Sequence, residues 1–199
     1  MCARSKRNTA IKSDYASYET NLKTDKFIGS PFVVQSCKGN HPSSYYDETN
    51  VVCSAPLGNT CISCEIRNMS PFNYSFSYKS DWLKEQILAR VDVGDGTHNN
   101  RAPGIPLEET SIPTPHIHLY REDGYFLAYR IDGVDYSSNE SVKFDYYQGY
   151  QYLCERLNIS GFNNVSPLFE FRPKGKLNLM VSDIDPNEGV EFPNNNDTE

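Results

Sequence analysis

The chain has 199 residues, and 38% of them are hydrophobic, which is enough for one domain with a packed core and short appendages. Its formal net charge is −7, with only bases among the charged residues of 1–12 and only acids among those of 183–199. A mildly acidic body argues against sequence-independent binding of duplex nucleic acid, which requires clustered lysine and arginine. It leaves room for a local basic site.

The start of the chain is polar, and no apolar run reaches the roughly 18 residues of a membrane helix. We therefore expect no signal peptide, no membrane contact and a location in the cytoplasm. In that reducing compartment all six cysteines are expected to be thiols. Two of them form a Cys-x-x-Cys motif, but no second pair completes a zinc clip, and strand alternation places the two on opposite faces. The six are Cys2, Cys37, Cys53, Cys61, Cys64 and Cys154.

Composition divides the chain into three regions. Residues 1–50 are expected to form a polar, partly ordered N-terminal extension, with loop-like composition over 36–50. Residues 51–182 are expected to form a single α+β domain. Residues 183–199 are acidic and rich in asparagine, which predicts a disordered tail that can be removed at little cost in stability.

Five segments of the central region alternate apolar and polar residues with the period of a half-buried strand. The link between the first two, Asn68–Pro71, is short, so these two strands should form an antiparallel hairpin. A long loop rich in glycine and proline, Gly94–Thr114, separates the third strand from the fourth, and loops of this length are often functional. The expected strands are Cys61–Arg67, Asn73–Lys79, Ile87–Val93, His116–Arg121 and Tyr125–Ile131.

A single helix follows the strands. Ser137 and Glu140 fit a capping box at its start, apolar residues recur at helical spacing up to Leu157, and Gly161 suits the position after its end. Consecutive strands followed by one helix predict an α+β fold: an antiparallel sheet of about five strands with a C-terminal helix packed on one face.

The chemistry of the chain concentrates around the fourth strand. Alternation places His116, His118 and Tyr120 on one face and Ile117 and Leu119 on the other. The two aliphatic residues should face the core, so the two imidazoles and the phenol should share a polar face toward solvent.

The third strand adds two charged residues to this picture. Arg90 and Asp92 share a face, and consecutive strands are neighbours about two times in three. The long loop carries His98 and Asn100 and could fold over the same surface. A histidine–arginine cluster is therefore expected on one face of the sheet.

Four interpretations of this cluster remain open. In the first, the cluster is a polar sheet face with no further role. In the second, His116 and His118 transfer protons on a phosphodiester whose charge Arg90 stabilises. In the third, His98, His116 and His118 hold a divalent metal such as Zn or Mn. In the fourth, the His-hydrophobic-His triplet is that of HUH nucleases, with a nucleophilic tyrosine supplied by the helix. The helix offers Tyr146, Tyr147, Tyr150 and Tyr152.

Several of these motifs resemble the signature of an uncharacterised family of small bacterial and prophage proteins. The resemblance covers about Cys61 to Asn163 and implies a bacterial or phage context, without an activity. The loop after Asn100 is longer than in that pattern, and its Asn-Pro-Asp-Gly turn is replaced by Asn-Arg-Ala-Pro. The segments that carry the resemblance are Leu88–Asp92, His98 with Asn100, Pro115–Glu122 and Cys154–Ile159.

The leading hypothesis is a small, phage- or mobile-element-associated phosphodiester hydrolase, a ribonuclease of the toxin or defence type, with RNA as partner. Its expected catalytic residues are His116, His118, Arg90, Asp92 and Tyr120. Its expected metal ligands, if it uses an ion, are His98, His116 and His118, and no other cofactor site is expected. The alternative is a non-catalytic, phage- or mobile-element-encoded inhibitor or antitoxin-like protein that binds a host or phage protein.

Overall fold

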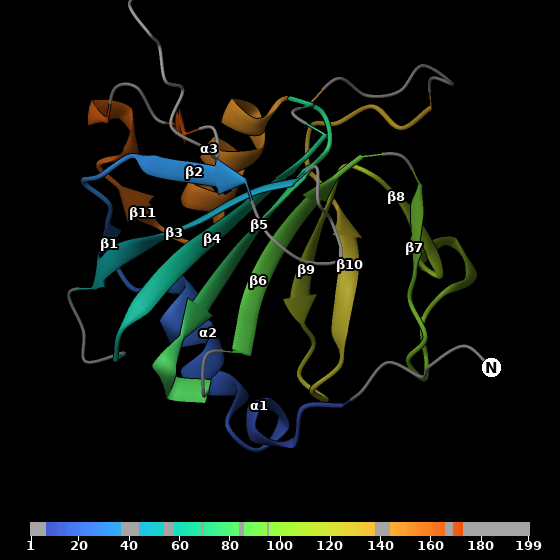
Figure 1. The fold of residues 1–199 in the computed structure, drawn as a ribbon. Coiled ribbons are helices and arrows are strands. Elements are labelled where there is room, and N and C mark those ends of the chain that lie inside the picture. The colour runs from blue at the N-terminus through green and yellow to red at the C-terminus, as the bar shows by residue number, and fades with distance from the viewer. Residues whose placement is uncertain are drawn as a thin grey trace, which may run out of the picture.

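A large sheet dominates the computed structural model (Figure 1). Its strands follow the order β10-β9-β6-β5-β4-β3-β1-β11, while β2 pairs with β3 and with β12. All pairs are antiparallel except β1 with β11 and β2 with β12. The prediction of a mixed fold with a mainly antiparallel sheet is confirmed, but ten strands replace the expected five. The structure describes residues 7–36, 44–53, 58–68, 70–83, 86–94, 96–137, 144–165 and 169–172.

All five expected strands are present, and their ends differ from the expectation by one residue or less. Strict alternation of apolar and polar residues explains this agreement, because only one register places every apolar side chain in the core. The first two of these strands form the expected antiparallel hairpin. The strands are β4 (Thr60–Arg67), β5 (Tyr74–Ser80), β6 (Gln86–Val93), β9 (His116–Tyr120) and β10 (Phe126–Arg130).

The additional strands lie mainly in the region that we expected to be an extension. Residues 44–50 belong to a long strand, so their interpretation as loop is wrong, and the expected boundary at residue 50 falls inside that strand. The strand pairs with β4 over eight residues, and this pairing overrides its local composition. The additional strands of the sheet are β1 (Lys26–Phe27), β2 (Phe32–Ser36), β3 (Ser44–Cys53), β11 (Ile159–Ser160) and β12 (Phe169–Arg172).

The start of the described chain is helical and packed, where a polar, partly ordered extension was expected. Helices α1 (Thr9–Ser13) and α2 (Tyr15–Lys23) bury Ile11 and Tyr18 completely. The Tyr18 hydroxyl donates to Leu88 O at 2.9 Å and accepts from Tyr120 N at 3.0 Å. It therefore replaces a rung of the β6–β9 ladder, which ties this region to the central sheet.

Helix α3 (Tyr146–Arg156) begins later than expected. Its N-cap is Asp145, which forms a capping box with Gln148, whereas Glu140 lies outside the described residues. The residue that follows the C-cap of α3 is Asn158, which adopts the left-handed conformation (φ 53°), and not Gly161 as expected. Gly161 lies further on and precedes the short helix η3 (Phe162–Asn164). No helix in the described ranges is long and apolar enough to span a membrane.

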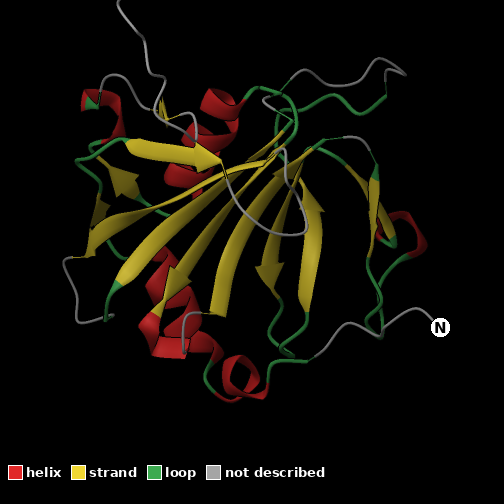
Figure 2. Ribbon diagram, in the orientation of Figure 1, coloured by secondary structure: helices red, strands yellow, loops and turns green. Residues whose placement is uncertain are grey.

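Alternation gives the sheet two different faces. The helix face carries Tyr74 and Phe76 and is covered by α3, whose Tyr150 ring lies 5.3 Å from that of Phe76. The opposite face, which we call the polar face, carries Ser75 and Ser77 on β5 and continues into β6 and β9. A separate two-stranded hairpin, β7 (Thr97–Asn99) with β8 (Ser111–Pro113), lies beside β10 (Figure 2). The loop between β7 and β8 contains the short helix η2 (Leu107–Glu109). The acidic tail after residue 182 lies outside the described residues.

Candidate functional site

The two histidines of β9 lie on the polar face, directly opposite the two charged residues of β6. In the antiparallel register, Arg90 pairs with His118 and Asp92 pairs with His116. The alternating Ile117 lies on the helix face and is 2% exposed. The predicted placement of both imidazoles with Arg90 on one face of neighbouring strands is therefore confirmed.

The third histidine, His98, lies on β7 of the β7–β8 hairpin. The His98 ring lies 4.5 Å from the His118 ring and 5.8 Å from the His116 ring, and the latter two rings are 4.8 Å apart. One nitrogen from each residue can be chosen so that all three lie within 4.8 Å of one another. The long loop thus brings its histidine to the pair on the sheet, as its sequence indicated.

The expected exposure of this face was wrong. His116 is 3% exposed and His118 is 1% exposed, because the hairpin covers them and the Phe126 ring stacks on His118 at 5.3 Å. Alternation predicts which side chains share a face, but it does not reveal that a distant hairpin covers that face. His116 and His118 are consequently interior groups, whereas His98 is half-buried.

Asp92 is the centre of the polar contacts. Its Oδ2 lies 2.7 Å from Arg90 Nη2, 3.0 Å from His118 Nε2 and 3.7 Å from His116 Nε2. Burial alone would raise the pKa of the Asp92 carboxyl, but the neighbouring imidazoles of His116 and His118 and the charge of Arg90 hold it well below its usual range. Asp92 is therefore a carboxylate that lies in contact with Arg90 and with both histidines of β9.

The hydrogen bonds define a consistent pair of imidazole tautomers. His116 Nδ1 lies 3.2 Å from the carbonyl oxygen of Pro113, so it is the protonated nitrogen and Nε2 carries the lone pair. His118 Nε2 lies 3.0 Å from Asp92 Oδ2, closer than its 3.3 Å to Arg90 Nη2, so it is the protonated nitrogen and the lone pair is on Nδ1. That buried Nδ1 makes no hydrogen bond within the described part of the chain. Each imidazole thus retains one nitrogen that can bind a metal.

His98 and His118 are neutral at physiological pH, because their pKa values are lowered. Burial lowers the pKa of His118 to about 4, with Arg90 acting in the same direction and the Asp92 hydrogen bond opposing it. Burial also lowers the pKa of His98, and His116 and Arg90 lower it further. Metal ions bind neutral imidazole, whereas a general acid must carry a proton at the working pH. The site is suited to metal binding and poorly suited to acid catalysis by His118.

Asn100 holds the hairpin in place, a role that was not predicted from its position in the motif. Its Nδ2 donates to Ala128 O at 2.8 Å and to Glu109 O at 2.9 Å, and its Oδ1 accepts from Ala128 N at 2.8 Å. The residue is 7% exposed. No local sequence pattern encodes this burial, so the anchor could be identified only in the structure.

A groove of about 540 Å³ runs along the polar face beside the histidines. Its walls come from β4, β5, β6 and the β7–β8 hairpin, and most of them are polar. Such a lining suits phosphate and sugar groups better than flat apolar rings. The charged and hydroxyl side chains that line it include Glu65, Arg67, Ser75, Ser77, Arg90, Asp92, Thr97 and Thr114, together with His98 and His116.

One expected catalytic residue lies outside this cluster. The Tyr120 ring packs against Tyr18 at 5.6 Å and Phe126 at 4.7 Å, at the far end of β9. The tyrosine nucleophile of the HUH interpretation is wrong for a related reason: α3 covers the helix face, so its tyrosines are separated from the histidines by the sheet.

The cysteines lie as the alternation predicted. Register places Cys61 beside Lys79 and Cys64 beside Phe76, on opposite faces of the sheet. Among the described cysteines, Cys53, Cys61, Cys64 and Cys154, none is in a disulfide, while Cys2 and Cys37 lie outside the described residues.

Comparisons with protein-family models, with curated proteins and with solved structures found no match to this chain. The chemistry of the site is therefore argued from its own residues. The resemblance to a family of bacterial and prophage proteins stays a prediction.

Proposed function

We propose that this protein is a metal-dependent hydrolase of phosphodiesters, with RNA as the substrate class. His98, His116 and His118 are proposed to hold one divalent ion, zinc or manganese. The observation that carries this proposal is the convergence of the three imidazoles, with one nitrogen of each within 4.8 Å of the others. Three protein ligands and one position for water or substrate are typical of catalytic zinc sites.

The surroundings of the histidines support a metal more than a proton relay. A metal-bound histidine usually donates its other N–H to a carboxylate or a carbonyl. His118 lies 3.0 Å from Asp92 Oδ2, and His116 lies 3.2 Å from Pro113 O. A tetrahedral Zn²⁺ holds its nitrogens about 3.3 Å apart, so small rotations of the rings would complete the site. A bound ion would supply a nucleophilic water at neutral pH and would polarise a phosphoryl oxygen.

Arg90 is proposed to hold the substrate. Its Nε and Nη2 point to Asp92 and His118, and its side chain is 31% exposed on the wall of the groove. The remaining N–H groups of the guanidinium can reach a phosphate oxygen in the groove, where planar donors match the oxyanion. Asp92 keeps both Arg90 and His118 oriented, so it is a positioning residue.

A second candidate is a protein that binds a host or phage protein without catalysis. The burial of His116 and His118 favours it, because an ion held there could serve only to fasten the β7–β8 hairpin to the sheet. Metal binding alone therefore does not decide between the two functions. Hydrolysis does.

The experiment measures both properties on the full chain. Metal-stripped protein is reloaded with zinc or manganese, bound metal is counted by mass spectrometry, and cleavage of fluorescent RNA and of bis(4-nitrophenyl) phosphate is recorded. We expect one ion per chain and metal-dependent cleavage. Alanine at His98, His116 or His118 should weaken metal binding by more than about 100-fold, since loss of a supporting residue alone costs 10–100-fold.

His41, the remaining histidine of the chain, is the control, and His41→Ala should bind metal as the wild type does. An ion bound in the expected ratio, with no cleavage of any RNA or model diester, would favour the binding protein. The absence of stoichiometric metal would contradict both the site and the hydrolase.

A further inference from the structure

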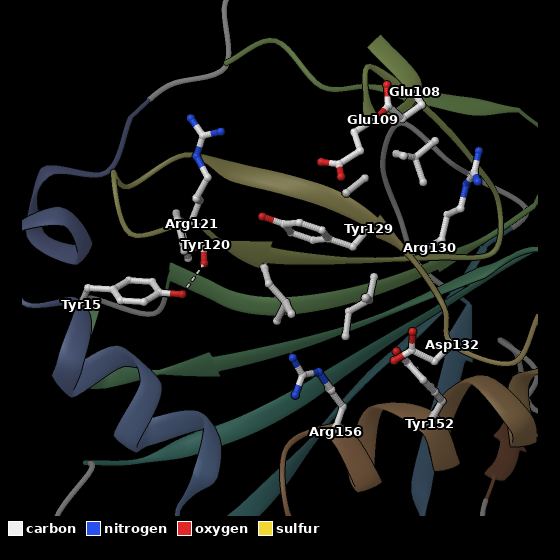
Figure 3. A pocket seen from close by; sticks show the side chains of 14 residues that line it. Tyr15, Glu108, Glu109, Tyr120, Arg121, Tyr129, Arg130, Asp132, Tyr152 and Arg156 are labelled. Atoms are coloured by element: carbon white, nitrogen blue, oxygen red, sulfur yellow. Dashed lines mark hydrogen bonds between the residues drawn. The ribbon is translucent and has the colours of Figure 1, made fainter. Parts of the chain in front are cut away.

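The strand that carries the histidines also forms the floor of a second hollow, on the opposite side of the sheet. Its volume is about 550 Å³, close to that of the groove beside the histidines and within the range of small-molecule sites. Ile117 and Leu119, which alternate with His116 and His118, line it. Figure 3 shows this hollow between β10, α2 and α3.

The floor of the hollow is apolar and its walls are aromatic. Ile117 of β9 forms part of the floor, Ile112 of β8 also lines the hollow, and each is 2% exposed. The ring of Tyr129 extends across the hollow in Figure 3, with Tyr15 at one end. Aromatic rings pack favourably on other rings and on aliphatic side chains. A flat aromatic group fits this lining.

One arginine at the edge of the hollow, Arg156, forms no ion pair with a described residue. Its side chain, in the last turn of α3, points toward the floor in Figure 3. Of the two other arginines, Arg121 is paired with Asp123 at 2.5 Å and Arg130 lies over the Tyr136 ring at 5.6 Å. Arg156 is therefore the cation available to a ligand.

The charges around the hollow disfavour a ligand with several negative charges. Glu108, Glu109 and Asp132 also line it, and no ion pair joins them to a described residue. These acids repel a polyanion such as a nucleoside triphosphate, because like charges are unfavourable in a partly enclosed site. One guanidinium binds one carboxylate through two parallel hydrogen bonds.

We infer that this hollow binds a small aromatic carboxylate. The carboxylate pairs with Arg156, and the ring lies on the apolar floor against Tyr129. This inference does not depend on the proposed hydrolase function, because the site lies on the other face of the sheet and uses none of the histidines. It assigns the hollow a ligand class that the polar groove, with its hydroxyl and charged lining, does not suit.

The test is a titration of the metal-stripped full chain with indole-3-acetate, followed by calorimetry and by saturation-transfer NMR. Stripping prevents the carboxylate from binding an ion at the histidines. A ligand with about 13 heavy atoms at about 0.3 kcal/mol per atom gives a dissociation constant of about 1 mM. Tryptamine, which keeps the indole and carries an ammonium group, should bind at least tenfold more weakly, and cyclohexylacetate at least fivefold more weakly.

Arg156→Met, which keeps the apolar stem and removes the charge, should weaken indole-3-acetate at least tenfold, and Tyr129→Leu at least threefold. The matched control is Arg121→Met, whose guanidinium is already held by Asp123, and it should change binding less than twofold. Circular dichroism and the melting temperature confirm that each variant is folded. Equal binding of tryptamine and indole-3-acetate, or unchanged binding to Arg156→Met, would overturn the inference. So would undetectable binding at 10 mM ligand.

Discussion

Asn100 and Ala128 exchange two hydrogen bonds of 2.8 Å, one from the amide Nδ2 to the Ala128 carbonyl and one from the Ala128 amide to Oδ1. A residue of a neighbouring strand would form the same two hydrogen bonds with its backbone. The side-chain amide of Asn100 therefore takes the place of a neighbouring strand at the outer edge of β10. The backbone of Asn100 is fixed too, because its N–H donates to Thr110 O at 2.8 Å. His98, two residues earlier, is consequently held over His118.

Asn100→Asp should detach the hairpin from β10. The carboxylate replaces two N–H donors that serve Ala128 O and Glu109 O, and it would face both carbonyls in a buried position. We expect a loss of roughly 2–4 kcal/mol in the free energy of unfolding and a drop in zinc affinity of about tenfold or more. Urea denaturation of the metal-stripped protein and a competitive zinc titration measure the two effects.

The neighbouring residue provides the matched control for that variant. Asn99 is exposed, so Asn99→Asp makes the same chemical change and should alter stability by less than about 0.5 kcal/mol. Equal zinc affinity for Asn100→Asp and the wild type would show that the hairpin does not depend on this anchor.

Burial of neutral His118 should make stability depend on pH. Its pKa is about 4 in the folded protein and 6.5 in the unfolded chain, so between these values the unfolded chain binds more protons. Stability is therefore complete above pH 6.5 and falls as the pH is lowered toward 4, by up to about 3 kcal/mol at 1.36 kcal/mol per pKa unit. The shift of Asp92 acts at lower pH, because its ordinary pKa is 3.8.

Denaturation of the metal-stripped protein at pH 7 and at pH 4.5 tests this dependence. His118→Asn cannot titrate in this window, so it should lose less stability on acidification than the wild type, while His41→Asn should behave as the wild type does. Parallel losses in the wild type and His118→Asn would show that His118 does not carry the effect.

Lys26 should join the ends of two helices. Its Nζ donates to Leu22 O and Thr24 O at the end of α2 and to Leu157 O at the end of α3, at 2.8–3.0 Å. Lys26→Met leaves these carbonyls without a donor, and we expect a loss of roughly 2–4 kcal/mol. Burial lowers the pKa of Lys26 to about 8, so the stability of the wild type should rise between pH 8 and 10.5, and that of Lys26→Met should not.

Lys23→Met is the control for this site. Lys23 is exposed and forms only a surface ion pair with Glu19 at 3.5 Å, so its loss should change stability by less than about 1 kcal/mol. Similar stability for both variants would mean that the three hydrogen bonds of Lys26 contribute nothing measurable.

Gly149 shows why helix propensity alone misleads. Replacing a helical glycine with alanine normally gains about 1 kcal/mol, yet here the new Cβ would lie 2.1 Å from the Tyr74 hydroxyl, which donates to Asp145 O at 2.7 Å. We expect Gly149→Ala to destabilise the protein by more than about 1 kcal/mol. The double variant with Tyr74→Phe should recover part of that loss, as measured by urea denaturation. A stabilising Gly149→Ala would contradict the close packing of α3 on β5.

The contrast between β9 and β3 explains how far the sequence could predict the fold. In β9, Ile117 and Leu119 alternate with the histidines, and this local pattern predicts the strand, its register and the shared face of His116 and His118. In β3, composition favours a loop, and the strand exists because it pairs with β4 along its length. The packing of residues 7–27 likewise depends on contacts such as Tyr18 with Leu88, 70 residues away.

The candidate site follows the same division. Alternation and the order of the strands predicted the pairing of Arg90 and Asp92 with the histidines. The burial of these groups could not be predicted, because the hairpin that covers them is fastened by Asn100 and by Phe126, through contacts that no local pattern encodes. That burial favours the proposed metal binding over proton transfer.

The central claim is that three histidines bind one divalent ion, and X-ray absorption at the zinc edge tests it most directly. For the full chain loaded with one equivalent of zinc, the account predicts three imidazole nitrogens and one further light atom at about 2.0–2.1 Å. The triple variant His98→Ala/His116→Ala/His118→Ala should lose this signal, and His41→Ala should keep it. Sulfur at about 2.3 Å, or an unchanged spectrum in the triple variant, would contradict the claim.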